Sequence, residues 1–351
     1  MKDTLTPQKI SNDLEENLIT KSFAIDLLFS IIDSSEDPLI REECIEAFRQ
    51  IEKKDEKIFK LLENHLISDE NPRVRNAAAK LIGIYYLDLG VESLCWSLSH
   101  DKSPIVLSTI ATIAESNFDN PHHRLNDGLK GLYNHISKQV GVIAGEARFF
   151  LDLETIFARN TLNYEMNFDE YKNYQKLKGF EKQDFWLRIE NERVVALYFH
   201  YFSWNYMKER KNSFTSFSKL IDPFIYLNAL KKLEIRKYVE FELPNSIGLL
   251  TRLKKLSLRD NGIEKLPLSF SKLILLEHLD LSWNAFTNIP ESIYSLKKLR
   301  YLNLAHNKIN DISQKILNLV NLKEVKLNDN VLTGASLEME DLVNSRIIHK
   351  I

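Results

Sequence analysis

The chain of 351 residues has few of the residues that staple or interrupt a fold. Its two cysteines, Cys44 and Cys95, cannot form a disulfide framework, and both fall within helical apolar patterns. We therefore expect them to be small core residues in a reducing compartment, the cytoplasm. With only 10 glycines and 9 prolines, long flexible linkers are not expected. No uncharged run is as long as a membrane span, and residues 1–14 lack the apolar core of a signal peptide.

Sequence motifs that mark catalysis are missing as well. The chain has no phosphate-binding Gly loop with Lys-Ser/Thr, no H-E-x-x-H, no G-x-S-x-G and no paired C-x-x-C. His122 and His123 are adjacent and would point apart on a helix, so no metal site is predicted. Acidic pairs such as Glu42-Glu43 are expected to be solvated charges rather than a general acid and base. We predict no cofactor and no catalysis, since a standalone lyase or hydrolase would need a nucleophile and a base.

The formal net charge of −2 conceals two unequal halves. Residues 1–160 contain 18 Lys and Arg against 26 Asp and Glu, a net of −8, whereas residues 161–351 contain 29 against 23, a net of +6. One interpretation is two solvated surfaces of different composition, and the other is that the halves attract different partners or each other. Neither charge is typical of a dedicated nucleic-acid binder, so no nucleic-acid partner is predicted.

What the sequence does have is repetition. From Leu253 onward the pattern L-x-x-L-x-L-x-x-N returns every 23 residues through four units, which indicates a stacked repeat. Leucines alternating with polar residues predict a short strand with one buried face. Leu266-Pro267 and Ile289-Pro290 follow in the second half of their units and predict an irregular or briefly helical outer wall. The last position of the pattern predicts a ladder of side-chain amides that satisfy the backbone of each turn: Asn261, Asn284, Asn307 and Asn330.

These residues resemble a leucine-rich repeat array of the intracellular 23-residue class, as in Ras-suppressor-like proteins. An earlier unit begins at Leu230 but has Tyr238 in the place of the asparagine, and one before it begins at Val194. The wider spacing between these two units predicts an insertion at about residues 205–217. The resemblance implies a short parallel sheet on a concave face that binds a protein, and it makes a small GTPase one partner class.

A second, helical repeat covers residues 20–158. Asp37-Pro38, Asn71-Pro72 and Ser103-Pro104 each precede a helical run, as expected for a capping residue followed by proline at the first helical position. An amphipathic helix lies before each proline, so the pattern predicts antiparallel helix pairs. A fourth helix pair, at about residues 124–156, lacks the proline signature.

The helical half resembles HEAT repeats, in particular the short bacterial and archaeal kind of phycobilisome-lyase-like proteins. The match lies in the signature D/N-P-x-V/I-R, which contains Arg41 and Arg75. The resemblance implies that these arginines bind acidic groups of neighbouring repeats. Leu107 replaces the arginine in the third unit, which predicts weaker stacking there. No lyase activity is implied, because such repeats are widespread structural units.

We predict an α+β chain in which a HEAT-like solenoid precedes a leucine-rich repeat solenoid. The expected parts are helical repeats at 1–158, a connecting helix and hairpin cap at 159–192, and leucine-rich repeats with a C-terminal cap helix at 193–351. Apolar and polar residues alternate in Phe185–Ile189 and Val194–Phe199, on either side of a turn, and this pattern predicts the hairpin. Trp186 is expected to cover the apolar edge at the end of the leucine-rich repeat array. The cap helix is expected at Ser336–Ile347.

The concave face consists of the residues that alternate with the strand leucines. Trp, Tyr and Arg dominate interface energies, so its aromatic and basic members are the predicted contacts for a protein partner. An alternative is that Trp283 and Tyr301 only fill gaps at the turns. We expect His278, Trp283, Tyr301 and His306 to lie at nearly the same level on adjacent strands. The predicted partner-binding residues are Tyr198, His200, Arg236, Arg259, His278, Asp280, Trp283, Tyr301 and His306.

Two functions fit this sequence. The first is a non-enzymatic adaptor whose concave face binds a protein, with a small GTPase as one class. The second is an accessory substrate-recognition subunit of an enzyme or modification system, in which the HEAT array holds the enzyme.

Overall fold

The computed structural model describes residues 5–51, 55–117, 123–158, 185–200, 222–236, 242–332 and 348–350. It divides the chain into two compact units, residues 1–136 with 154–167 and residues 137–153 with 168–351. The boundaries expected at residues 158 and 192 stay predictions. The predicted insertion at 205–217, the connecting helix, the cap helix and His122 lie outside the described residues. None of the helices described is both long and apolar enough to cross a membrane.

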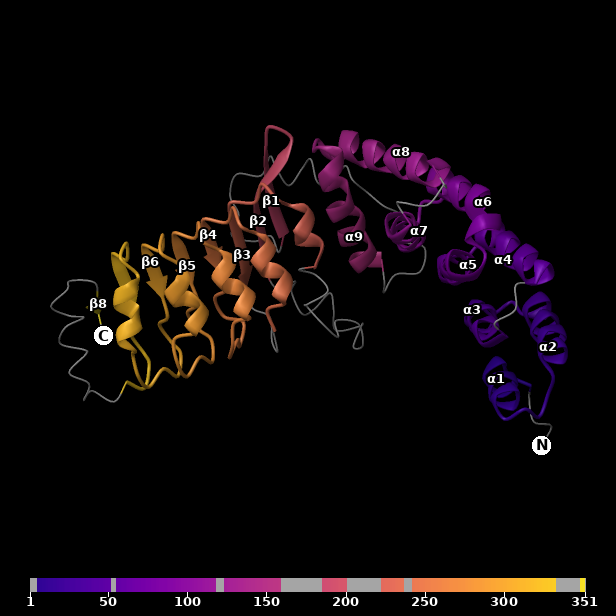
Figure 1. Cartoon of the computed structure of the whole chain (residues 1–351), viewed down its shortest axis with the longest axis horizontal. Helices are drawn as coiled ribbons and strands as arrows, with labels where there is room; N and C mark the ends of the chain where they lie inside the picture. The colour runs from indigo at the N-terminus through magenta and orange to yellow at the C-terminus, as the bar shows by residue number, and fades with distance from the viewer. Residues whose placement is uncertain are drawn as a thin grey trace. The chain divides into compact units, whose positions relative to one another are not determined.

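The first unit is a succession of antiparallel helices (Figure 1). Helix α8 ends beyond this unit and helix α9 begins beyond it, so each contributes residues to both units. The helices are α1 Pro7–Glu15, α2 Lys21–Ser34, α3 Pro38–Ala47, α4 Glu56–Ser68, α5 Pro72–Tyr85, α6 Leu87–His100, α7 Pro104–Ser116, α8 His123–Val140 and α9 Ala147–Ala158.

Capping explains where the second helix of each pair begins. α3, α5 and α7 each have proline at the first helical position, as the sequence predicts. Asp37 accepts a hydrogen bond from the backbone N–H of Leu39, and Asn71 accepts one from that of Arg73. Ser103 precedes α7 without a side-chain capping bond.

Buried ion pairs join consecutive helix pairs. Arg41 donates through Nε and Nη2 to the carboxylate of Asp69 at 2.9 and 3.0 Å, and Arg75 donates in the same way to Asp101 at 2.8 and 3.0 Å. The expected arginine ladder is therefore confirmed for two repeats. Leu107, in the third, is buried.

The two thiols differ in their surroundings. Cys44 is completely buried, and burial raises the pKa of its thiol to about 12, which fits the predicted core role. Cys95 is only half-buried, although burial also raises its pKa. Both are free thiols.

Protonation of Asp69 provides a test of the arginine ladder. Burial alone would raise the pKa of Asp69, but hydrogen bonds from His65 and Arg41 outweigh it and hold the pKa well below its usual range. The ion pair therefore stabilises the fold above about pH 4 and is lost as the pH falls below that value. Asp69→Asn should lower the free energy of unfolding at pH 7 by about 3 kcal/mol, because a partly buried guanidinium loses its partner.

The difference between Asp69→Asn and wild type should shrink at about pH 3. Urea unfolding followed by far-ultraviolet circular dichroism measures both differences. Asp127→Asn removes an exposed carboxylate and should change stability by less than about 0.5 kcal/mol. An equal difference at both pH values would contradict the role given to Asp69.

The second unit contains an eight-stranded sheet in chain order (Figure 1). β1 and β2 form the predicted antiparallel hairpin, whose turn residues Asn191 and Glu192 have positive φ. All later pairings are parallel, and β8 adds a strand that the sequence pattern did not predict. The strands are β1 Phe185–Glu190, β2 Arg193–His200, β3 Lys232–Arg236, β4 Lys255–Ser257, β5 His278–Asp280, β6 Tyr301–Asn303, β7 Glu324–Lys326 and β8 Ile348–Lys350.

Short 3-10 turns form the wall behind the sheet, as predicted. The turns η4, η5 and η6 each begin directly after a proline, because the fixed φ and missing N–H donor of proline suit the position just before the turn. Phe270 and Phe286 are completely buried between the wall and the strand leucines. The turns are η3 Asp222–Tyr226, η4 Asn245–Leu249, η5 Leu268–Lys272, η6 Glu291–Ser295 and η7 Gln314–Asn318.

The asparagine ladder is confirmed. Asn307 donates through Nδ2 to the carbonyl of Leu281 in the preceding repeat at 3.0 Å and to that of Leu304 in its own at 2.9 Å. Its Oδ1 accepts from the backbone N–H of Phe286 at 3.1 Å. The other three asparagines of the ladder likewise donate to a carbonyl of the preceding repeat.

Residues 137–153 belong to the sheet unit, where they support its first end. Glu146 is completely buried, pairs with Arg193 at 2.8 Å and accepts a hydrogen bond from the backbone N–H of Val194. Phe149 packs against Phe224 with ring centroids 5.9 Å apart. The sequence suggested only the hairpin as a cap, and the side chain of Trp186 lies outside the described residues.

Removing one amide of the ladder should weaken the stack. Asn307→Ala leaves an N–H and carbonyls in a buried turn without partners, so we expect the free energy of unfolding to fall by about 3 kcal/mol. Hydrogen exchange should place the loss at the amide of Phe286 and its neighbours. Asn288→Ala, at an exposed position, should change stability by less than about 0.5 kcal/mol. Similar losses in the two variants would show that the ladder contributes nothing particular.

Candidate functional site

The candidate site is the open sheet face. We use this name for the side of β2–β7 opposite to the side on which the strand leucines are buried. Register aligns equivalent positions of successive repeats, so that His278 pairs with Tyr301 and Asp280 with Asn303. Leu279 and Leu302, which lie between them, are completely buried. Side chains at these aligned positions therefore form rows across the sheet.

One row lies just past the ends of the strands, and its backbone is in the left-handed region. Asp260, Trp283, His306 and Asp329 occupy the same position in four repeats, with φ of 61°, 58°, 54° and 56°. Aspartate and histidine are among the residues that tolerate this region, whereas a bulky residue such as tryptophan does so only at a cost. Trp283 is nevertheless 47% exposed. Its side chain therefore gains little from the core to offset the strain.

Three side chains of this row, together with that of Arg259, the residue before Asp260, lie in contact across four repeats. Trp283 stacks on His306 with centroids 4.0 Å apart and planes at 28°. The guanidinium carbon of Arg259, in the preceding repeat, lies 5.8 Å from the ring centroid of Trp283. His306 Nε2 lies 3.3 Å from Asp329 Oδ2. The result is a row of Arg259, Trp283, His306 and Asp329, which we call the exit row.

A second row lies on the strands themselves. His278 and Tyr301 have ring centroids 6.2 Å apart, and Lys326 Nζ is 5.5 Å from the Tyr301 centroid. Burial lowers the pKa of His278, and the charge of Lys255 lowers it further, so this imidazole is mostly neutral at pH 7. At the first end of the sheet, Lys232 Nζ lies 4.6 Å from the ring centroid of Tyr198.

The structure thus sorts the predicted site residues into two levels. Trp283 pairs with His306 past the strand ends, while His278 pairs with Tyr301 on the strands, so the four do not share the single level expected from the sequence. Asp280 accepts hydrogen bonds from the N–H and hydroxyl of Ser282 at 2.9 and 2.6 Å, which gives its carboxylate a local structural role.

Some contributors were missed and one could not be placed. Lys232 and Lys326 contact the predicted tyrosines and could have been found from the same alternation along β3 and β7. Asp329 could have been found from its position one residue before an asparagine of the ladder. The side chain of His200 lies outside the described residues.

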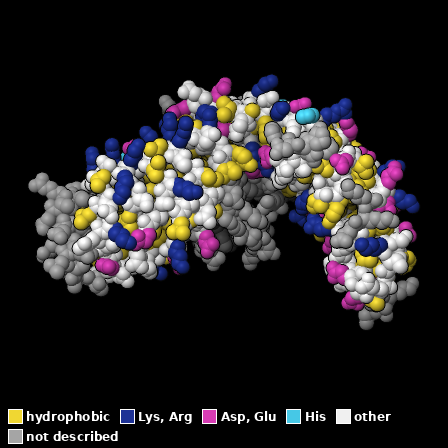
Figure 2. All heavy atoms as spheres, viewed as in Figure 1, with side chains coloured by type: hydrophobic (Ala, Val, Ile, Leu, Met, Phe, Trp, Pro, Cys, Tyr) yellow, Lys and Arg dark blue, Asp and Glu magenta, His cyan; other side chains and the backbone are white. Residues whose placement is uncertain are grey.

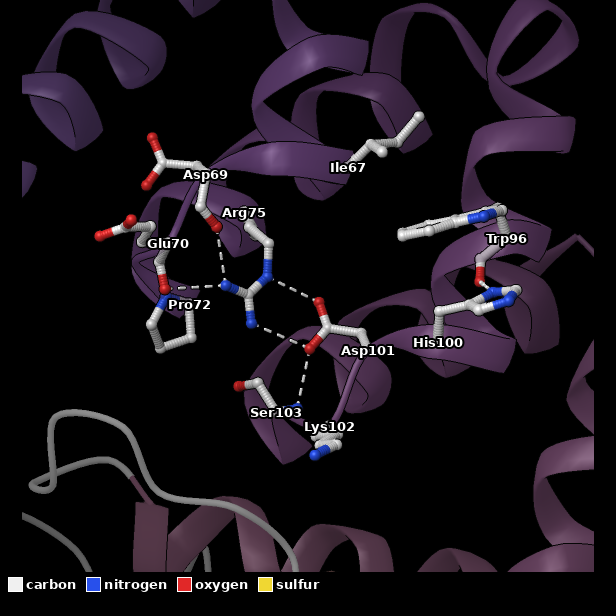
Figure 3. Close-up of a pocket in the computed structure, with 10 residues that line it drawn as sticks. All are labelled: Ile67, Asp69, Glu70, Pro72, Arg75, Trp96, His100, Asp101, Lys102 and Ser103. Atoms are coloured by element: carbon white, nitrogen blue, oxygen red, sulfur yellow. Dashed lines mark hydrogen bonds and ion pairs between the residues drawn. The ribbon is translucent and has the colours of Figure 1, made fainter.

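The first unit has a separate exposed groove of about 370 Å³ at the end of α6 (Figure 3). Trp96, 42% exposed, stacks on His100 with centroids 4.5 Å apart, and Ile67, 39% exposed, also lines the groove. The ion pair of Arg75 with Asp101 also lines the groove. The groove therefore presents apolar and aromatic surface beside charges that are already paired.

Within the part of the chain that the structure describes, no three His, Cys, Asp or Glu residues are grouped to hold a metal ion.

Family models match both halves of the chain. One describes HEAT repeats and matches residues 25–114, and the other describes a leucine-rich repeat region and matches residues 214–347. The chain consists of HEAT repeats followed by leucine-rich repeats. Repeats of both families stack into solenoids whose extended surfaces commonly bind other proteins.

No curated protein matches this HEAT and leucine-rich repeat chain. Similar solved structures include an internalin (InlF) from Listeria monocytogenes, 28% identical over 31% of each chain with a TM-score of 0.28. Another is the LRR protein LIC12759 from Leptospira interrogans, 25% identical over 35% of this chain and 38% of that one, with a TM-score of 0.30. A third is Listeria monocytogenes InlP, 31% identical over 35% and 33%, with a TM-score of 0.30. The chain covers less than two thirds of each of these proteins.

Substitution of Trp283 by asparagine separates a binding role from a packing role. Asparagine tolerates the left-handed backbone, so relief of strain should offset the lost stack on His306. We expect Trp283→Asn to unfold within about 1 kcal/mol of the wild type. Phe270→Ala, in the core, should lose about 3–5 kcal/mol in the same urea titration. A loss as large as that of Phe270→Ala would favour the interpretation that Trp283 fills a gap.

Proposed function

We propose that the open sheet face of the leucine-rich repeats binds a protein partner and that the chain is a non-enzymatic adaptor. The main support is Trp283, a large aromatic side chain that is exposed although its backbone is strained. Exposed tryptophan, tyrosine and arginine are the residues that dominate interface energies, and the two rows bring all three together. The free thiols are in line with a cytoplasmic location, which we also propose.

The resemblance to Ras-suppressor-like repeats makes a small GTPase the first partner class to test. GTPase switch segments change conformation with the bound nucleotide, so a partner of this class should bind in a nucleotide-dependent way.

A second candidate is an accessory substrate-recognition subunit, in which the HEAT repeats hold an enzyme and the leucine-rich repeats select its substrate. The observation that favours it is the groove around Trp96, a second exposed aromatic surface on the other unit. Such a subunit should copurify with an enzymatic activity.

Affinity purification from native extract tests the proposal. The baits are the wild type, Trp283→Ala/Tyr301→Ala, Trp96→Ala, and the control Leu268→Ala/Val320→Ala, which removes exposed apolar side chains away from the open sheet face. Each purification is run with a GTP analogue and with GDP. We expect the wild type and the control to retain a partner that the Trp283/Tyr301 variant loses by roughly tenfold or more.

The outcomes separate the candidates. Retention by the Trp283/Tyr301 variant, with its fold verified by circular dichroism, would remove the open sheet face as the main site. Loss with Trp96→Ala alone would move the site to the HEAT groove and favour the accessory subunit. A partner independent of nucleotide would argue against a GTPase.

A further inference from the structure

Two arginines at equivalent positions of adjacent repeats lack the partners that buried arginines normally have. Arg236, at the end of β3, and Arg259, just past β4, are half-buried. The Nε atom of each is completely buried without a hydrogen-bond partner. Neither guanidinium forms an ion pair with another residue that the structure describes, whereas Arg41 and Arg75 each bind an aspartate through two bonds. Because each residue is only half-buried, an anion on the open sheet face can reach the other donors of the guanidinium.

Two lysines and Glu234 share the open sheet face of β3 and β4 with the pair. Lys232 and Lys255 are aligned neighbours on the same two strands. On the face of the second unit seen in Figure 2, Lys and Arg side chains are more frequent than those of Asp and Glu. Such a surface attracts an acidic partner and disfavours a basic one.

We propose that Arg236 and Arg259 bind two carboxylates of an acidic segment of the protein partner, beside an apolar residue on Trp283. This inference rests on the proposed function, because it assigns a partner chemistry to the same face. The planar guanidinium fork matches a carboxylate through two parallel hydrogen bonds. Arg259 is near the ring of Trp283, so the same segment meets the arginines and then the aromatic surface.

The spacing of the strands allows two carboxylates of one extended peptide, one on each guanidinium. Adjacent strands lie about 4.8 Å apart, and alternate side chains of an extended peptide lie about 6.7 Å apart. Because about 6.7 Å exceeds about 4.8 Å, a peptide has to cross the strands obliquely, at roughly 45°, to place residues i, i+2 and i+4 on Arg236, Arg259 and Trp283 in turn. The segment that fits is Glu-x-Glu-x-Phe, in one of the two chain directions. A single phosphate would require both guanidinium groups to converge on one anion.

Labelled peptides measure this directly on the full chain. The probes are dodecapeptides in a Gly-Ser background that contain Glu-x-Glu-x-Phe or its reverse, the matched Gln-x-Gln-x-Phe peptides, and a peptide with one phosphoserine in place of both glutamates. Fluorescence anisotropy gives each dissociation constant at low and at high salt. We expect a glutamate peptide to bind roughly tenfold or more tightly than its glutamine counterpart, with affinity falling as salt rises.

Variants assign the effect to the pair. Arg236→Gln/Arg259→Gln should lower the affinity for the glutamate peptide to that for the glutamine peptide. Arg236→Lys/Arg259→Lys retains the charge but loses the fork, so it should recover only part of the affinity. The control Lys265→Gln/Lys272→Gln removes two exposed charges outside the open sheet face and should bind like the wild type.

Equal binding of glutamate and glutamine peptides, or no saturable binding of either below about 1 mM, would overturn the inference. Tighter binding of the phosphoserine peptide would overturn it in favour of a phosphorylated segment. The proposed function fails separately: a partner from extract that the Trp283/Tyr301 variant loses and the Arg236/Arg259 glutamine variant retains would support the open sheet face and reject the carboxylate site.

Discussion

The second unit depends on one constraint, which is that the four repeats of the asparagine ladder each end in a turn whose backbone groups need partners. The asparagine ladder meets this constraint, because each side chain donates to the repeat before it, and those of Asn284, Asn307 and Asn330 also donate to their own strand end. An amide can do this where a leucine cannot, since it offers a donor and an acceptor from the same short side chain. The leucines supply burial, but the amides fix where one repeat stops relative to the next. Strand register, and hence the rows on the open sheet face, follows from them.

That register explains why a strained tryptophan is tolerated. The position before each ladder asparagine is held in the left-handed region by hydrogen bonds on either side, as where the N–H of Trp283 donates to the carbonyl of Ala305. Aspartate or histidine fits there at little cost in other repeats. The strain at Trp283 is therefore imposed by the stack and not by its own contacts. A residue whose conformation is fixed before binding loses little entropy when a partner arrives.

The sequence period predicted the repeats and the ladder, and alternation predicted the hairpin, because each depends on residue type at a fixed spacing. The two arginine bridges were expected from the resemblance to HEAT repeats. The sequence pattern identified the face on which Trp283 and Tyr301 lie, but not their separation into two rows, because alternation ends where the strand ends and the left-handed turn begins. The sequence pattern also did not predict that residues 137–153 belong to the sheet unit. Those residues have the same amphipathic pattern as other helices, and tertiary contacts such as the buried bond of Glu146 to Arg193 and the packing of Phe149 on Phe224 show which unit they join.

Arginine has opposite uses in the two units, and solvent exposure of its partners explains the difference. Arg41 and Arg75 bind aspartates that are themselves buried, so their bonds are screened little and help to hold neighbouring repeats together. Arg236 and Arg259 lie on an open face where a permanent acidic partner would compete with any ligand. Leaving them unpaired costs stability but keeps their charge available, a trade common at binding surfaces. The helical unit uses arginine to join its own repeats, and the sheet unit presents it to another molecule.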